Sequence, residues 1–304
     1  MNQVLNRPVS YQEASARERL QQMFDPGSFE EFLPPSERVI SPHLAQLNAP
    51  VAFDDGVAVG RAMLGGVAVY TAAQEGGFMG GAVGEVHGAK LVGLLRRAVT
   101  DKIAAVVLLV ESGGVRLHEA NAGLIAVSEV MRALLDARAA GIPVIVLVGG
   151  SNGAFGGMGI VTRCANVVIM SEEGRLAMSG PEVIETANGV EEFDSRDRAL
   201  VWRSTGGKHR YLMGDCQRIV ADDVKAFRAA AQEAVAACSR QPAALSLEAL
   251  EAEQKMLDER LSRFGSLRDP VDIWTAMQMP QAGNIPMLDV DSFIAAAATR
   301  RQGA

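Results

Sequence analysis

The sequence predicts an α/β fold with a mainly parallel sheet, and two features of its central third support that prediction. Residues 104–110 and 144–148 are short valine-rich runs that are apolar at nearly every position, as in strands covered on both faces. Each run is followed by a glycine turn and then by a segment that looks helical. Strands that alternate with helices pair in parallel, with the helices as crossovers.

Composition limits the class of protein. The 304 residues carry a formal net charge of −7, so no basic surplus exists to neutralise nucleic-acid phosphates. The three cysteines, Cys164, Cys216 and Cys238, are far apart and odd in number, which suits a reducing compartment. No apolar run reaches membrane-spanning length and no secretory leader pattern is present. We therefore expect a cytoplasmic protein that binds neither nucleic acid nor membrane.

Three segments are expected along the chain. Residues 1–50 form a polar N-terminal arm, with a short helix over 14–24 that ends at the turn signal Asp25-Pro26-Gly27. We expect this arm to dock without contributing chemistry. Residues 51–240 carry the central domain, and residues 241–304 form C-terminal helices and a tail.

The predicted elements of the central domain begin with a hairpin. Residues 57–64 and 67–72 are valine-rich runs separated by Gly65-Gly66, which favours a primed turn. A glycine-rich loop at 76–81 precedes a helix that ends near residue 101. The next helix, over 119–140, has one apolar face and stops at a glycine. The residues of that face are Leu124, Val127, Met131, Leu134 and Leu135.

The second half of the central domain continues the alternation. A short helix runs to about residue 163, and residues 167–170 and 175–178 are predicted as strands. Gly180-Pro181 opens another helix, because proline is favoured at the first helical position. Further helices are expected over 222–238 and 246–263.

The two glycine turns are the candidate functional site. A glycine turn at a helix N-terminus leaves backbone N–H groups unpaired and aimed at an anion or a polarised carbonyl. We therefore predict that Gly113, Gly114, Gly156 and Gly157 form oxyanion holes; ordinary tight turns are the alternative. A nucleotide-phosphate loop is less favoured, since neither G-x-x-x-x-G-K-[ST] nor G-x-G-x-x-G is present.

Several motifs follow one another in a recognisable order. They are Asp25-Pro26-Gly27-Ser28-Phe29, Gly77-Phe78-Met79-Gly80-Gly81 with Gly84-Glu85, Ser112-Gly113-Gly114-Val115-Arg116, Gly156-Gly157 and Ser179-Gly180-Pro181-Glu182-Val183-Ile184-Glu185. Over residues 20–240 this series resembles the carboxyltransferase subunits of the acyl-CoA carboxylase family, in the crotonase-like superfamily. Residues 190–198 and 205–210 are similar to malonate decarboxylase β subunits.

Two departures narrow the resemblance. The four-cysteine zinc ribbon that precedes this domain in the bacterial acetyl-CoA carboxylase β subunit is missing here. The second turn is also longer and richer in glycine than the usual form. It therefore stays open which of Gly153, Gly156 or Gly157 lies at the donor position.

The resemblance implies a fold, a substrate and partners. The implied fold is the ClpP/crotonase spiral of ββα units, with a mainly parallel sheet and flanking helices. The implied partner is a related γ-type carboxyltransferase subunit, with the active site at the interface. The implied substrate is a malonyl thioester on the phosphopantetheine-type arm of an acyl carrier protein, with no cofactor bound directly. The implied products are acetyl thioester and carbon dioxide.

Decarboxylation of a malonyl thioester leaves an enolate, whose oxygen needs preorganised donors. Arg116 is a candidate to pair with a carboxylate or a phosphate, or is an ordinary arginine at a helix start. His118 is a candidate to protonate the enolate, or is a solvated histidine. His87 and His209 are further candidates, and these three histidines are too scattered to indicate a metal site.

Three alternatives remain open. The same oxyanion holes would serve the carboxyltransferase subunit of a biotin-dependent system, which passes the carboxylate to biotin. A serine hydrolase would need Ser151, His209 and Asp215 together, although no G-x-S-x-G elbow is present. The third alternative is a non-catalytic scaffold that supports a catalytic sibling subunit.

Overall fold

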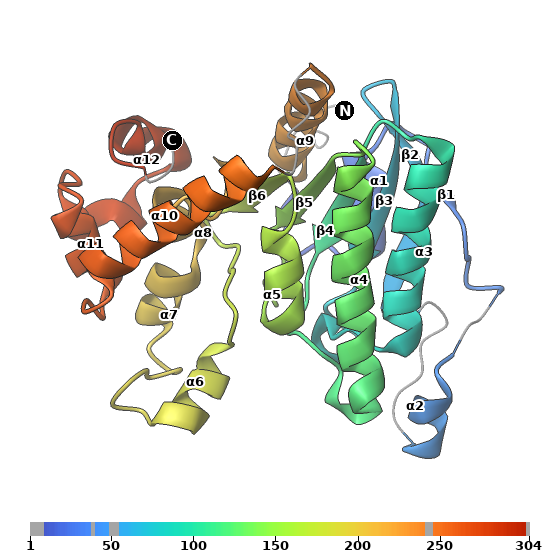
Figure 1. Ribbon diagram of the computed structural model, residues 1–304, viewed down its shortest axis with the longest axis horizontal. Helices are drawn as coiled ribbons and strands as arrows, with labels where there is room; N and C mark the ends of the chain where they lie inside the picture. Colours follow the sequence, from blue (N-terminus) through green and yellow to red (C-terminus); the bar gives the residue numbers. More distant parts are fainter. Residues whose placement is uncertain (1–8, 38–39, 49–54, 241–245, 302–304) are drawn as a thin grey trace, which may run out of the picture.

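A twisted sheet with helices on both faces forms the centre of the molecule (Figure 1). The computed structural model describes residues 9–37, 40–48, 55–240 and 246–301. The predicted boundary between residues 50 and 51 lies outside the described residues, and the one between 240 and 241 borders an undescribed segment. Within the described residues, no helix combines the length and apolar character needed to span a membrane.

The sheet has seven strands in sequence order, and its larger part is parallel. The strands are β1 (Glu30–Glu31), β2 (Val57–Leu64), β3 (Val67–Gln74), β4 (Val106–Val110), β5 (Val144–Val148), β6 (Val167–Ser171) and β7 (Arg218–Val220). Strands β1 to β3 pair antiparallel and β3 to β7 pair parallel, which confirms the predicted sheet. Gly65 and Gly66 both have positive φ in the β2–β3 turn, as a primed hairpin turn requires.

Helices cover both faces of the sheet, and alternate side chains of each strand contact opposite layers. One face carries α3 (Glu85–Asp101), α4 (Asn121–Ala139) and α5 (Gly156–Arg163), and the other carries α1 (Ala16–Met23) and α9 (Val224–Arg240). In β4, for example, Leu108 belongs to the first apolar cluster, whereas Val107 and Leu109 belong to the second. This double coverage explains why β4 and β5 are apolar throughout.

A third apolar cluster holds the C-terminal helices beside the sheet, on the side of β6 (Figure 1), where α12 (Val290–Ala297) contacts β7. Trp274, Phe264 and Phe293 are buried there against Leu212 and Ile219 of the central segment. The remaining elements are α2 (Pro42–Gln46), η2 (Met79–Gly81), η3 (Leu117–Glu119), α6 (Pro181–Asn188), α7 (Arg198–Thr205), α8 (Gly207–Leu212), α10 (Leu247–Phe264), α11 (Pro270–Ala276) and η4 (Ala282–Met287).

Two predicted elements differ from the structure. Residues 175–178 form no strand; they make only isolated bridges, Ala154 with Leu176 and Arg175 with Gly206. On α4, Leu124 is 54% exposed and Leu135 is 36% exposed, so the predicted apolar face is rotated. The rotation follows from close packing on α3. A Cβ placed on Gly88 would lie 2.5 Å from the Cβ of Ala126, so small residues rather than leucines occupy the contact.

Candidate active site at the junction of two glycine turns

The first turn (residues 111–116) and the second turn (residues 149–158) follow the adjacent strands β4 and β5, and the two turns meet. Gly114 has a φ of +122° and Gly156 a φ of +55°. A Cβ placed on Gly156 would lie 3.0 Å from the Cα of Gly114, closer than a side chain normally allows. Glycine is therefore required at this junction both for backbone conformation and for close approach.

In the first turn, two of three successive N–H groups have acceptors inside the protein. The N–H of Gly113 donates to the carbonyl oxygen of Gly80 at 2.8 Å. The N–H of Gly114 donates to the Oγ of Ser112 at 3.1 Å. Among the described residues, no acceptor is found for the N–H of Val115.

In the second turn too, some N–H groups have acceptors inside the protein and others do not. The N–H of Gly153 donates to Gly150 O and that of Gly156 to Met178 O, both at 2.9 Å. For the next two N–H groups, those of Gly157 and Met158, the described part of the chain holds no acceptor. These residues are in the first turn of α5, where the helix dipole adds positive potential.

These internal hydrogen bonds change the set of N–H groups that could bind a ligand. Gly113, Gly114, Gly153 and Gly156 use their N–H groups internally, so the structure does not offer them as donors to a ligand. Gly157 keeps a free N–H, and a Cβ on it would lie 2.5 Å from Val127 of α4.

Sequence reasoning missed Val115 and Met158, because a free N–H depends on where the preceding ones are bonded. The rule that the first N–H groups of a helix lack partners is the signal that points to Met158. The backbone of the two turns is close at this point, since a Cβ on Gly156, the residue before Gly157, would lie 3.9 Å from the N atom of Val115.

Arg116 lies behind the first turn and faces the protein interior. The residue is 1% exposed, and its Nη1 pairs with Asp55 at 3.0 Å and with Glu119 at 2.9 Å. Its Nη2 donates to the carbonyl oxygens of Asp55 and Ala82. In this chain the guanidinium of Arg116 is committed to buried carboxylates and carbonyls, which favours the alternative that Arg116 has a structural role over the prediction that it binds a substrate carboxylate or a phosphate.

The histidines fall into two groups. His118, on η3 beside the first turn, is exposed. His87 and His209 are buried, and burial lowers the pKa of each to about 3, so both are neutral at physiological pH. His87 contacts the amide of Gln74 at 2.9 Å, and His209 accepts from the indole N–H of Trp274 at 3.2 Å. Only His118 of these three combines exposure with a position beside the turns.

The three residues that a serine hydrolase would need, Ser151, His209 and Asp215, bind other partners. The Oγ of Ser151 donates to Gln12 O at 3.3 Å, and His209 pairs with Trp274. The carboxylate of Asp215 pairs with Arg210 and Arg260, each at 3.0 Å. No hydrogen bond therefore joins the serine, the histidine and the aspartate, which contradicts this alternative.

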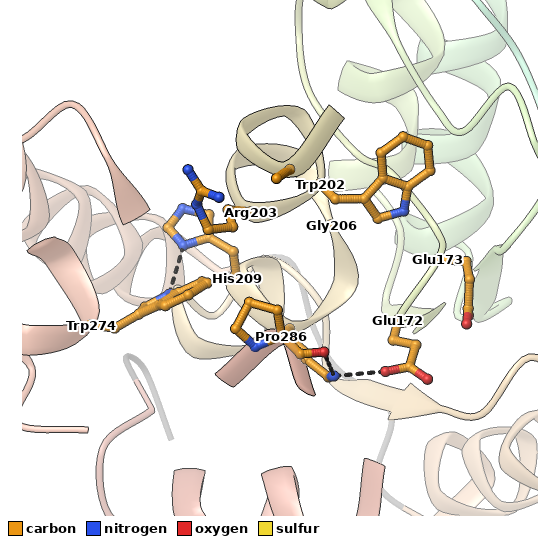
Figure 2. A pocket seen from close by; sticks show the side chains of 10 residues that line it. Glu172, Glu173, Trp202, Arg203, Gly206, His209, Trp274 and Pro286 are labelled. Carbon is orange, nitrogen blue, oxygen red and sulfur yellow. Dashed lines mark hydrogen bonds and ion pairs between the residues drawn. The ribbon is translucent and has the colours of Figure 1, made fainter. Parts of the chain in front are cut away.

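A cavity of about 400 Å³ lies between α7, α8 and the C-terminal helices (Figure 2). Its lining includes Trp202, His209 and Trp274 and no residue of either turn. The guanidinium of Arg175 lies 4.7 Å from the Trp202 ring and 5.5 Å from the ring of Phe155, the N-cap residue of α5. Stacked side chains thus connect the cavity wall to the second turn. Among the described residues, no group of three His, Cys, Asp or Glu side chains is placed to hold a metal ion.

Comparisons with known proteins identify the family of the chain. Residues 12–255 match the carboxyl transferase domain family. The chain is 39% identical over 310 aligned positions to the malonyl-S-ACP:biotin-protein carboxyltransferase MADC of Malonomonas rubra, covering 95% of each protein. It is 31% identical over 187 positions to the acetyl-coenzyme A carboxylase carboxyl transferase subunit beta of Fusobacterium nucleatum, covering 58% of this chain and 59% of that one.

Solved structures agree with the sequence comparisons. A chain of a Pseudomonas malonate decarboxylase hetero-tetramer in complex with malonate superposes with a TM-score of 0.77 and 35% identity, covering 88% of this chain and 97% of that one. The transcarboxylase 12S structure, at 24% identity and a TM-score of 0.62, covers 73% of this chain and 40% of that one and shows the shared fold. These likenesses confirm the predicted crotonase-like fold and an activity of the carboxy-lyase or carboxyltransferase type. The chain belongs to the carboxyl transferase domain family.

Proposed function

We propose that this chain is the β subunit of a biotin-independent malonate decarboxylase that acts on a malonyl thioester carried by an acyl carrier protein. The observation that carries the proposal is the junction of the two turns, where the N–H groups of Val115, Gly157 and Met158 have no acceptor among the described residues. The similarity to a malonyl-S-ACP carboxyltransferase and to a malonate decarboxylase supports the choice of substrate.

The chemistry requires donors at a thioester oxygen. The bond between the malonyl Cα and its carboxylate breaks, carbon dioxide leaves, and the electron pair becomes an enolate on the thioester. The N–H groups of Val115 and Gly157 stabilise the enolate oxygen, and each such donor is typically worth about 3 kcal/mol. A proton then adds to Cα and gives the acetyl thioester. His118 is the proposed donor, because it is exposed beside the first turn.

A partner surface surrounds the junction. Six large apolar side chains on the elements next to the turns are more than 40% exposed, which favours a protein partner over solvent. They are Leu117, Leu124, Ile125, Ile160, Met178 and Val183. We propose that a related γ-type carboxyltransferase subunit covers this surface and that the active site lies between the subunits. The phosphopantetheine-type arm of the carrier would bring the thioester there, with no cofactor bound directly to this chain.

A second candidate function is a biotin-dependent carboxyltransferase. The Malonomonas relative is by name a biotin-protein carboxyltransferase, and the match extends over 95% of both chains. The same donors would stabilise the same enolate, but the carboxylate would pass to biotin before release. The two candidates differ only in the acceptor of the carboxylate.

The test is carbon dioxide release from a malonyl thioester by this chain co-purified with its partner subunits, with and without avidin. Release that avidin leaves unchanged supports direct decarboxylation. Release or carboxyl transfer that avidin abolishes supports the biotin-dependent candidate. Absence of turnover in an assembled complex would contradict both candidates and leave the scaffold alternative.

A further inference from the structure

We propose that Glu111, held by Arg19 of the N-terminal segment, is a positioning residue that fixes the second turn against the first. This inference rests on the proposed function, because it concerns the donors of the same site. Glu111 directly follows β4 and precedes the first turn's glycines, yet its carboxylate contacts residues of the second turn.

The carboxylate of Glu111 binds the middle of the second turn. Its Oε1 accepts the backbone N–H of Asn152 at 3.1 Å and the side-chain Nδ2 of the same residue at 3.2 Å. Two further bonds join the turns nearby: Ser112 N to Gly153 O at 2.7 Å, and Phe155 N to Ser112 O at 2.9 Å. Phe155 is the N-cap of α5, so these contacts determine where the free N–H groups of the helix point.

The backbone encloses this carboxylate closely. A Cβ on Gly76 would lie 2.3 Å from Oε1 of Glu111, and a Cβ on Gly150 would lie 2.3 Å from Oε2. Glu111 is 5% exposed, so little water can replace a lost contact. An ionised group enclosed in this way needs a compensating charge.

Arg19 supplies that charge from a distant part of the chain. It is 1% exposed, and its Nη1 lies 2.5 Å from Oε2 of Glu111. Its Nε and Nη2 donate to the carbonyl oxygens of Tyr11 and Gln12, at 2.8 Å and 3.2 Å. Gln12 O also accepts from Ser151 of the second turn at 3.3 Å. The N-terminal segment therefore holds the second turn from two sides, although the sequence indicated an arm without chemistry.

The test compares two double variants in the assembled complex, Arg19→Met/Glu111→Gln and Arg19→Met/Glu111→Leu. Both lack the buried ion pair and have similar side-chain size, but only glutamine offers an acceptor to Asn152. We expect kcat of the leucine variant to be about tenfold to a hundredfold below that of the glutamine variant, because small misplacements of catalytic donors are costly. KM should be similar in both, since binding of the thioester arm is not changed.

A second measurement does not depend on activity. Amide hydrogen exchange of the segment 150–158 should be faster in the leucine variant than in the glutamine variant. Asn152→Ala, a substitution in a half-buried turn, should raise exchange and lower kcat without lowering the unfolding midpoint. The control is Asp101→Asn, which weakens the ion pair with Arg97 at the end of α3, beside the start of β4 and away from the turn that follows β4. It should leave both exchange of 150–158 and kcat of the folded enzyme unchanged.

The outcomes separate the two proposals. Equal exchange and equal kcat in the leucine and glutamine variants, with wild-type behaviour of Asn152→Ala, would overturn the positioning role of Glu111. An unmodified complex that is inactive on malonyl thioesters, but shows the expected differences in exchange, would contradict the proposed function and leave the positioning role intact.

Discussion

Each glycine turn is supported by a buried arginine–carboxylate cluster, but the two clusters are assembled differently. Behind the first turn, Arg116 pairs with Glu119, three residues further along, and with Asp55. Behind the second turn, Asn152 is held by Glu111, whose charge is balanced by Arg19, 92 residues away. The first cluster is therefore made of residues between Asp55 and Glu119, whereas the second depends on docking of the N-terminal segment.

The largest effect is expected from breaking the cluster behind the first turn. Arg116→Met would leave Asp55 and Glu119 buried without their cation and lower the free energy of unfolding by about 3–5 kcal/mol. Chemical denaturation measures this loss. The control is Arg132→Met, which removes an exposed partner of Glu129 and should cost less than about 1 kcal/mol. Equal losses in the two variants would contradict the assignment of Arg116 as a structural anchor.

The next effect concerns the junction itself. Gly156→Val would force a side chain into the 3.0 Å approach to Gly114 at a positive φ, and thereby separate the donors of the two turns. We expect kcat to fall at least about a hundredfold, the cost of losing one oxyanion donor. Complex assembly, measured by size-exclusion chromatography, controls for misfolding. An assembled variant with unchanged kcat would favour the scaffold alternative.

Two buried histidines, one in the cluster behind the first turn and one at the cavity, should make stability depend on pH. The backbone N–H of His87 donates to the carboxylate of Asp55, within the first cluster, whereas His209 lines the cavity. Their folded-state pKa values of about 3 lie below the unfolded value of about 6.5, so the unfolded chain binds more protons between these values. The contribution of each neutral histidine to the free energy of unfolding is fully present above pH 6.5. It is lost towards pH 3, by about 1.4 kcal/mol per pH unit for each histidine.

Denaturation at pH 7.5 and 5.5 checks this expectation. His209→Gln should remove the pH-dependent loss of unfolding free energy that is due to His209 and leave the loss that is due to His87. A free energy of unfolding that is the same at both pH values in the unmodified protein would show that neither histidine is held neutral.

The smallest effect is a glycine substitution away from both turns. Gly93 is exposed in the middle of α3, and no atom lies within 4 Å of a Cβ placed on it. Gly93→Ala should raise the free energy of unfolding by about 0.5–1 kcal/mol, because glycine is costly inside a helix. Its kcat should equal that of the unmodified protein. A loss of activity in this variant would show that the effect of Gly156→Val is not specific to the junction.

Local patterns in the sequence predict much of this fold. The valine runs predict β4, β5 and β6, because a strand buried on both faces needs apolar residues throughout. Gly65-Gly66 predicts the β2–β3 hairpin, because positive φ favours glycine. The apolar face of α4 is less predictable. Val127 and Leu134 of the predicted face are buried, whereas Leu124 and Leu135 are exposed, because small residues such as Ala126 make the contact with α3.

The positions of the two glycine turns are predicted from the sequence, but their free N–H groups are not. Glycine pairs identify both turns, yet the free donors include Val115 and Met158, which have no distinctive side chain. Which N–H is free depends on long-range partners such as Gly80 O and Met178 O, and one sequence does not reveal them. The same holds for Arg19 and Glu111, whose pairing requires the N-terminal segment to pack on the sheet.

The proposed function requires that the backbone N–H of Val115, and not that of Gly113, stabilises the enolate. Replacing a residue by its α-hydroxy analogue substitutes an ester oxygen for one N–H and keeps the side chain. At Val115 we predict that kcat on the malonyl thioester falls about a hundredfold with KM unchanged. At Gly113, whose N–H donates to Gly80 O, we predict lower stability with kcat of the folded enzyme unchanged. Unchanged kcat at Val115, or a matching loss at Gly113, would contradict the account.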